Sequence, residues 1–138
     1  MIFEPTTDTE ITRCYPVVVQ LRPHLDEPTF LERVRRQMQQ GYRLAARLDG
    51  DAIVAVAGYR LGENLVSGRH LYVDDLVTDE RGRSRGHGRE LLAWLAVRAR
   101  ELGCATLELD SGVQRAAAHR FYFENRMTIS SFHFRLPL

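Results

Sequence analysis

The chain has 138 residues, of which 44% are hydrophobic and 27% are charged, and its formal net charge is +1. This composition is close to that of ordinary soluble globular proteins, and the length allows a core that needs no disulfide or metal staple. The balanced charge gives no bulk attraction to nucleic acid. Cys14 and Cys104 stand in no metal-ligand spacing, so we interpret them as small buried side chains and expect no metal site.

No targeting or membrane segment is visible in the sequence. The first ten residues, MIFEPTTDTE, are acidic and contain no apolar stretch of the signal-peptide kind. No apolar run approaches the roughly 20 residues that span a bilayer. We therefore expect a cytoplasmic protein with no membrane partner. Because no repeat or linker interrupts the chain, residues 1–138 are predicted to form one domain.

The first forty residues are predicted to hold a short strand at Ile2–Glu4 and two helices. The first helix is expected over Asp8–Leu21, although Pro16 interrupts it. The second is expected over Pro28–Gln40 and ends before Gly41. Its apolar side chains recur at helical spacing: Phe30, Leu31, Val34 and Met38.

Three strands are predicted to follow as an antiparallel meander. Tyr42–Leu48 and Ala52–Arg60 flank the turn Asp49-Gly50-Asp51, and Asp-Gly between two apolar runs indicates a hairpin. A loop is expected at Leu61–Gly68, and the third strand at Arg69–Thr78.

The second half is predicted to return to helices and strands in alternation. Gly88–Leu102 carries an apolar stripe typical of an amphipathic helix, and a buried strand is expected at Ala105–Asp110. The resulting right-handed crossover predicts parallel neighbours for these strands. A helix at Gln114–Asn125 and a last strand at Thr128–Leu136 complete an α/β fold with a mixed sheet and helices on its faces.

The loop that follows the third strand of the meander carries the strongest functional signal. It reads Arg83-Ser84-Arg85-Gly86-His87-Gly88 and leads into a helix, where backbone N–H groups are unpaired and the helix dipole is positive. Gly86 and Gly88 allow close approach of a ligand to the backbone. Positive charge gathers around them on Arg81, Arg83, Arg85 and Arg89. The loop therefore predicts a pyrophosphate site.

Other phosphate or nucleic-acid sites fit this loop less well. It lacks the Gly-Lys-Ser/Thr of a P-loop, and it does not follow the Gly-x-Gly-x-x-Gly pattern of a dinucleotide site. A nucleic-acid-binding turn over Arg81–Arg89 would bind in a steeply salt-dependent way. No aromatic side chain is interleaved there for base stacking, so no nucleic-acid partner is expected.

Two motifs connect the sequence to a known family. Arg83-x-x-Gly86-x-Gly88 after the strand Leu71–Thr78 resembles the acyl-CoA pyrophosphate motif of the GNAT superfamily of N-acetyltransferases. Ala118-His119-Arg120-Phe121-Tyr122 is similar to the family's later motif, in which Ala precedes an aromatic-Tyr pair. The match runs from Leu71 to about Met127. It implies a GNAT-like, mostly antiparallel sheet with flanking helices, and transfer of an acetyl group from acetyl-CoA to a primary amine by direct attack in a ternary complex.

The resemblance also implies roles for particular residues. The backbone of Leu76, Val77 and Thr78 would pair with the pantetheine arm, and Tyr122 would stand near the thioester sulfur. Main-chain N–H groups of the loop would hold the pyrophosphate, from Arg83, Ser84, Arg85, Gly86, His87, Gly88 and Arg89.

The chain departs from the family pattern at two places. Arg115 stands where members often carry Asn, which bears on one contact to the cofactor arm. Arg126-Met127 replaces a common Gly-Phe, which bears on the turn after the helix and on the acceptor side.

Tyr122 and Asp74 are the candidate catalytic residues. With a solution pKa of about 10, a tyrosine can protonate a leaving thiolate, although Tyr122 could also be a half-buried aromatic. Strand alternation puts Asp74 on the face of Leu76, where it could take the amine proton or bind a cationic acceptor; an ion pair with an arginine is the alternative. Asp75 is expected on the other face in a structural role. We rank two histidines below Asp74: His119 and His133.

A non-catalytic acyl-CoA-binding module, such as a sensor or regulatory subunit, would keep the loop without needing either catalytic residue. The acceptor itself is not readable from the sequence and could be a small molecule or a peptide. A homodimer through the terminal strand remains open.

Overall fold

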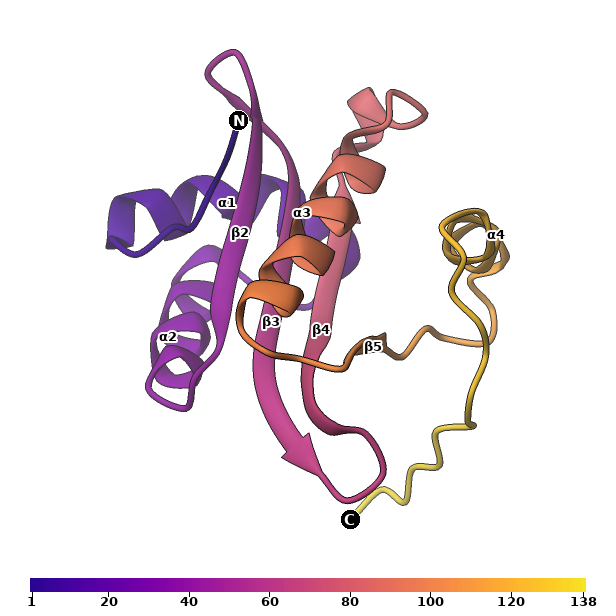
Figure 1. Cartoon of the computed structure of the whole chain (residues 1–138). Coiled ribbons are helices and arrows are strands. Elements are labelled where there is room, and N and C mark those ends of the chain that lie inside the picture. Colours follow the sequence, from indigo (N-terminus) through magenta and orange to yellow (C-terminus); the bar gives the residue numbers. More distant parts are fainter. The chain divides into compact units, whose positions relative to one another are not determined.

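The computed structural model describes all 138 residues, and its contacts divide the chain into two units, 1–108 and 109–138 (Figure 1). Each unit is described by itself. None of the helices has both the length and the apolar character needed to cross a membrane. The regular elements are, in chain order, β1 (Ile2–Phe3), α1 (Asp8–Leu21), α2 (Glu27–Met38), β2 (Arg43–Asp49), β3 (Ala52–Asn64), β4 (Gly68–Thr78), the 3-10 turn η1 (Glu80–Gly82), α3 (His87–Glu101), β5 (Thr106–Leu109) and α4 (Ala116–Glu124).

The first helix, α1, begins at a reciprocal cap. The Thr7 side chain accepts a hydrogen bond from the Glu10 N–H, and the Glu10 carboxylate accepts one from the Thr7 N–H at 3.0 Å. The helix then continues through Pro16 to Leu21, over the residues that the sequence predicts. α2 starts one residue before its predicted start, because the Asp26 side chain caps it by accepting from the Thr29 N–H.

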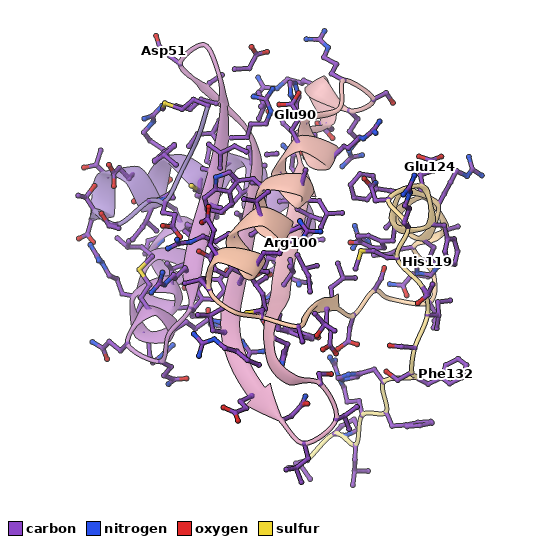
Figure 2. The ribbon with its side chains drawn as sticks, viewed as in Figure 1. Asp51, Glu90, Arg100, His119, Glu124 and Phe132 are labelled. Atoms are coloured by element: carbon purple, nitrogen blue, oxygen red, sulfur yellow. The ribbon has the colours of Figure 1, made fainter.

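The sheet is a meander with the order β1-β2-β3-β4-β5, and its first three pairings are antiparallel. The predicted hairpin between β2 and β3 forms, with Asp51 at its tip (Figure 2). β5 takes the place beside β4 that the crossover predicted. A mixed, mostly antiparallel α/β fold is thus confirmed.

The predicted loop Leu61–Gly68 is wrong for most of its length. β3 continues to Asn64 and pairs with β4 from Leu61↔Leu71 to Asn64↔Gly68. Only residues 65–67 form the turn, where the Asn64 side chain accepts from the Ser67 N–H at 2.7 Å. Polar residues such as Glu63 and Asn64 are typical of a loop. Strand pairing uses backbone hydrogen bonds, however, so the ends of β3 and β4 can pair outside the core without apolar side chains.

An irregularity interrupts the ladder between β3 and β4. Gly58 pairs with Asp75 and the next residue, Tyr59, pairs with Val73, so that Asp74 has no partner on β3. Asp74 is therefore the extra residue of a β-bulge. A bulge places two successive side chains on one face and shifts the alternation of the strand beyond it.

The two faces of the sheet carry different helices. α1 and α2 cover one face, where Cys14, Phe30 and Val56 belong to one buried cluster with Val77 of β4. On the other face α3 contacts β2, β3 and β4 (Figure 1) and buries its apolar stripe, formed by Leu91, Leu92, Leu95 and Ala99.

The second unit contains α4 and a C-terminal segment without regular structure. The predicted last strand, Thr128–Leu136, is wrong: no strand forms after α4. A strand requires a partner that completes its backbone hydrogen bonds, and α4 is the only element that lies wholly in this unit. Within the unit, the His133 Nδ1 lies 3.1 Å from an Asp110 carboxylate oxygen.

Candidate active site

The loop predicted to hold a pyrophosphate joins β4 to α3 and contains two backbone positions with positive φ. Ser84 has φ 69° and Gly86 has φ 82°. This left-handed conformation is costly for a side-chain-bearing residue such as Ser84 and natural for glycine. Left-handed residues are also a component of anion-binding nests, in which successive N–H groups face a common concavity.

The start of α3 leaves backbone donors free of helical partners. No side chain caps the helix at Gly86, and the first helical hydrogen bond runs from the Glu90 N–H to the Gly86 carbonyl at 3.0 Å. The N–H groups of His87, Gly88 and Arg89 therefore precede the first helical hydrogen bond and have no acceptor within the helix. They also sit at the positive end of the helix dipole.

Positive side chains surround these donors, but they are not equivalent. Arg83, Arg85 and Arg89 are exposed, so their charges can turn toward an anion. Arg81 forms an ion pair with Asp79, in which its Nη2 lies 2.6 Å from Asp79 Oδ2. Glu90, on the first turn of α3 (Figure 2), pairs with Arg47 of β2 at 2.6 Å, which directs its negative charge to the sheet.

The ring of His87 is buried and has no hydrogen-bond partner at either nitrogen. It packs beneath the loop, where a Cβ added at Gly82 would lie 3.2 Å from the His87 ring. Only its backbone N–H is then available at the start of α3.

The residues predicted to pair with the pantetheine arm lie at the end of β4. On one side their partners are in β3: Leu76 pairs with Ala57, Val77 with Val56 and Thr78 with Ala55. On the other side stands β5, whose approach is fixed by a 2.8 Å bond from the Ala105 N–H to the Arg69 carbonyl. β5 has four residues, about 13 Å of strand, whereas Leu76 lies about 23 Å along β4 from Arg69. The β4 edge at Leu76–Thr78 is thus beyond the reach of β5.

Asp74 forms an ion pair, the alternative that the sequence left open. Arg60 donates to both carboxylate oxygens, from Nε and from Nη2, each at 2.8 Å. The Arg60 guanidinium also lies 5.3 Å from the ring centre of Tyr72. Arg60, Tyr72 and Asp74 therefore gather on one face of the sheet.

Asp75 has a structural role, as expected. It was expected on the face opposite Asp74, but both side chains lie on the same face. Its carboxylate accepts a 2.7 Å hydrogen bond from the buried Tyr42 hydroxyl and a 3.0 Å bond from Arg22. Arg22 also donates to the Asp74 carbonyl at 3.1 Å. Burial, followed by the negative charge of Asp75, raises the pKa of Tyr42 well above its ordinary value.

The expectation that Asp74 shares a face with Leu76 is wrong because of the bulge. Leu76 pairs with Ala57, which alternates with Gly58, and Gly58 pairs with Asp75. Leu76 therefore points to the α3 face, whereas Asp74 and Asp75 both point to the face of α1 and α2.

Tyr122 lies on α4, in the second unit. Burial raises the pKa of its hydroxyl, and the positive charge of Arg115 partly opposes that shift. Its ring packs edge-on against Phe121, with ring centres 5.5 Å apart. A tyrosine with a raised pKa stays protonated at neutral pH and can donate a proton. On the same helix, the His119 Nε2 lies 2.8 Å from the Gly112 carbonyl oxygen.

Three residues that hold this region gave no signal in the sequence. Gln20 and Arg22 stand at the end of α1, where polar residues are ordinary, and Tyr42 precedes β2. Their partners, on β4 or directly after it, are more than 30 positions away. Only the three-dimensional packing brings them together. No cluster of three or more His, Cys, Asp or Glu side chains could hold a metal ion.

Comparisons with known proteins agree with this architecture. The acetyltransferase (GNAT) family model matches residues 6–126. The chain is 38% identical over 135 residues to the uncharacterised N-acetyltransferase YhdJ of Bacillus subtilis, covering 96% of this chain and 95% of that protein. It is 36% identical over 66 residues to an aminoalkylphosphonate N-acetyltransferase of Salmonella typhimurium, covering 48% and 43% of the two chains.

Solved structures show the same fold. The aminoglycoside N-acetyltransferase AAC(6')-Iy in complex with CoA superposes with a TM-score of 0.88 at 12% identity, over 100% of this chain and 93% of that chain. A GNAT family acetyltransferase of Staphylococcus aureus gives 0.84 at 16% identity, over 100% and 98%. The family match over most of the chain and the full-length relative lead to one conclusion: this chain belongs to the GNAT family and is an N-acetyltransferase.

Proposed function

We propose that the protein transfers an acetyl group from acetyl-CoA to a primary amine, by direct attack in a ternary complex. The observation that carries the proposal is the loop before α3. It combines positive φ at Ser84 and Gly86, uncapped N–H groups on the first turn of α3, and exposed arginines. Together these features suit a pyrophosphate, the anionic centre of CoA.

The edge of β4 supports the same donor. At Leu76–Thr78 the backbone lies beyond the reach of β5, so an extended pantetheine arm can add to the sheet there as a further strand would. The arm would leave the loop along β4 toward the bulge at Asp74. The thioester would then lie near the middle of the strand.

In the reaction, the neutral amine attacks the thioester carbonyl carbon, a C–N bond forms and the carbonyl oxygen gains negative charge. The C–S bond then breaks with the electron pair on sulfur. We assign Tyr122 the role of proton donor to this thiolate, because its raised pKa keeps the hydroxyl protonated. The amine loses its extra proton to a base.

Asp74 is our candidate for that base, acting directly or through water, or for a contact to a cationic acceptor. Asp74 and Leu76 lie on opposite faces of the sheet. The assignment is supported by the position of Asp74 at the bulge and by the Arg60 pair that orients its carboxylate. A carboxylate has about four lone-pair sites, of which Arg60 uses two.

The acceptor class rests on relatives. The names of two similar proteins state amine-bearing acceptors, an aminoalkylphosphonate and an aminoglycoside. We therefore propose an amine-bearing small molecule or peptide as the acceptor.

Calorimetric titration of the purified protein with acetyl-CoA and CoA tests the proposal, with ATP and a dinucleotide as controls. Gly86→Val forces a β-branched residue into the left-handed region inside the loop, and we expect binding at least tenfold weaker. Gly50→Val imposes the same conformation on the β2–β3 turn and should bind normally. Absence of CoA binding by the wild-type protein would overturn the proposal.

A further inference from the structure

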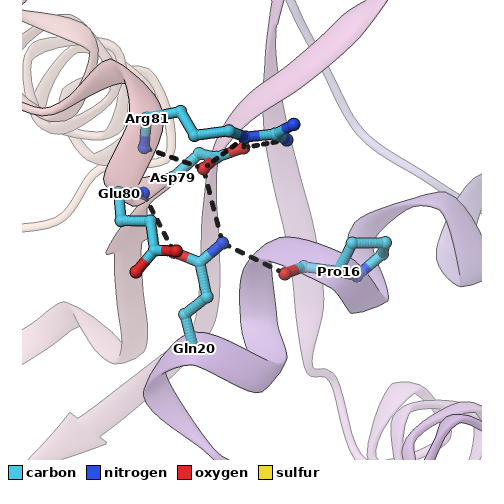
Figure 3. Close-up of polar contacts among 5 residues, drawn as sticks. All are labelled: Pro16, Gln20, Asp79, Glu80 and Arg81. Carbon is cyan, nitrogen blue, oxygen red and sulfur yellow. Dashed lines mark hydrogen bonds and ion pairs between the residues drawn. The ribbon is translucent and has the colours of Figure 1, made fainter.

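Asp79, at the end of β4, is almost fully buried although it carries a charge. Only 3% of the residue is exposed. Its Oδ1 accepts the Arg81 N–H at 3.1 Å, which caps η1, and its backbone N–H donates to the Val54 carbonyl at 2.8 Å. Its two oxygens also receive the Arg81 side chain through Nε, at 3.2 Å, and Nη2, at 2.6 Å (Figure 3). Asp79 therefore fixes both the backbone and the guanidinium of Arg81.

Gln20 connects the same point to α1. Its Nε2 donates to Asp79 Oδ1 at 3.4 Å and to the Pro16 carbonyl at 3.2 Å. Its Oε1 accepts the Glu80 N–H at 2.9 Å (Figure 3). One amide thus bridges the last turn of α1 to the first two residues after β4.

We infer that Asp79 and Gln20 are positioning residues for the donor, which hold the loop before α3 in its pyrophosphate-binding shape. This inference rests on the proposed function. Neither side chain touches the donor itself. Both act through the turn Glu80–Gly82, from which the loop leaves β4.

The geometry explains why the loop needs such an anchor. Beyond η1 the chain passes through the strained backbone of Ser84 and through Gly86, which has no side chain to pack. At the far end the loop is anchored by the buried ring of His87 and by α3. At the near end, Asp79 and Gln20 are the side chains that fix it. A loop ordered before binding loses less entropy when the ligand arrives, which strengthens binding.

The arrangement also sets the charge that the donor meets. The Asp79 carboxylate compensates Arg81 while Arg83, Arg85 and Arg89 stay exposed. Arg81 keeps Nη1 outside the pair, and its side chain is 82% exposed. Its guanidinium plane is thereby fixed at the rim of the loop.

The test compares two donors, acetyl-CoA and acetyl-pantetheine, which is a thioester without the pyrophosphate. The variants are Asp79→Asn and Gln20→Ala. Asn keeps a side-chain oxygen to cap η1 but removes the ion pair with Arg81, and Ala removes the bridge from α1. Glu32→Gln is the control, because it breaks an ion pair with Arg36 on α2.

We expect the Kd for CoA and the KM for acetyl-CoA to rise about tenfold in both variants, a change that corresponds to the loss of one positioning interaction. With acetyl-pantetheine, kcat/KM should stay within twofold of the wild-type value, and the control should match wild type with both donors. General destabilisation would lower activity with both donors equally, and that result would overturn the inference.

Two further outcomes separate the inference from the proposed function. If wild-type protein binds CoA and both variants bind it equally well, the positioning role falls and the acetyltransferase reaction stands. If wild-type protein binds no CoA, both fall. Gln20 lies at the last turn of α1 and Gln20→Ala is a mild helical substitution, so this variant decides the question should Asp79→Asn fold poorly.

Discussion

The ring of Tyr42 lies directly against the backbone of Gly58. A Cβ built on this glycine would stand 1.7 Å from the Tyr42 hydroxyl oxygen and 2.3 Å from the ring carbon that bears it. The contact places the hydroxyl 2.7 Å from Asp75, which pairs with Gly58 across the strands. Because Gly58 has no side chain, the Tyr42 ring can lie against it and donate its hydroxyl hydrogen bond to Asp75.

Gly58→Ala should destabilise the protein, because the methyl group and the Tyr42 ring cannot occupy the same space. We expect the free energy of unfolding to fall by about 1–3 kcal/mol, as for other overpacked sites. Chemical denaturation monitored by circular dichroism measures it. Gly62→Ala is the matched control on β3, since its Cβ would meet only the His70 ring at 3.0 Å, which can turn away. Equal losses for the two variants would contradict the packing argument.

Tyr122→Phe tests the proton donor. Removing the hydroxyl should lower kcat by about a hundredfold and leave the Kd for CoA unchanged, because general acid catalysis contributes on this order. Since the pKa of Tyr122 is raised, the wild-type rate should show no loss of the acid below about pH 10. Tyr15→Phe, which removes a hydroxyl bonded to the Leu25 carbonyl, controls for loss of a tyrosine hydroxyl as such. An unchanged kcat would remove Tyr122 from the mechanism.

Asp74→Asn tests the base. The variant keeps the shape of the side chain but cannot take up a proton, so we expect kcat/KM for the amine to fall about a hundredfold with normal CoA binding. Arg60→Gln retains the carboxylate and removes its bidentate partner, and it should lose less activity. Steady-state kinetics with varied amine separates the two variants. If both lose activity equally, Asp74 serves only as the partner of Arg60.

The acid stability of the protein should depend on Asp79. Hydrogen bonds from the Arg81 side chain, before other causes, lower the pKa of Asp79 to about 2, against about 3.8 unfolded. A depressed folded pKa means that the carboxylate stabilises the fold fully above about pH 4 and loses that effect as pH falls toward 2. The stability difference between wild type and Asp79→Asn should shrink over that interval. Denaturation at pH 6, 4 and 2.5 measures it, and a constant difference would show that the ion pair contributes nothing.

Much of this fold follows from local patterns in the sequence. Asp-Gly at the β2–β3 turn and the apolar stripe of α3 depend on neighbours a few positions apart, and both elements lie where they were predicted. The place of the loop between β4 and α3 was predictable for the same reason, because a strand, glycines and a helix start follow one another in the chain.

The side chains around Asp74 and Asp75 could not be predicted in this way. Strict alternation along β4 assumes one residue on each strand per step, and the bulge breaks that assumption without a glycine or proline to mark it on β4. The partners of both aspartates also come from other elements: Arg60 from β3, Arg22 from the end of α1, and Tyr42 from before β2. Nothing in their local sequence indicates these contacts.

The bulge at Asp74 also keeps a charge out of the interior. If Asp74 paired regularly instead of bulging, Asp75 would continue the alternation of Leu71 and Val73, which are both buried and are 0% and 3% exposed. It would then point into the apolar layer beneath α3, where an unpaired carboxylate costs several kcal/mol. The extra residue turns Asp75 toward two donors and gives its place to Leu76. Deletion of Asp74 would leave a regular ladder, with Val73 opposite Tyr59 and Asp75 still opposite Gly58. Asp75 and Leu76 would then keep their faces, and the carboxylate that pairs with Arg60 would be lost.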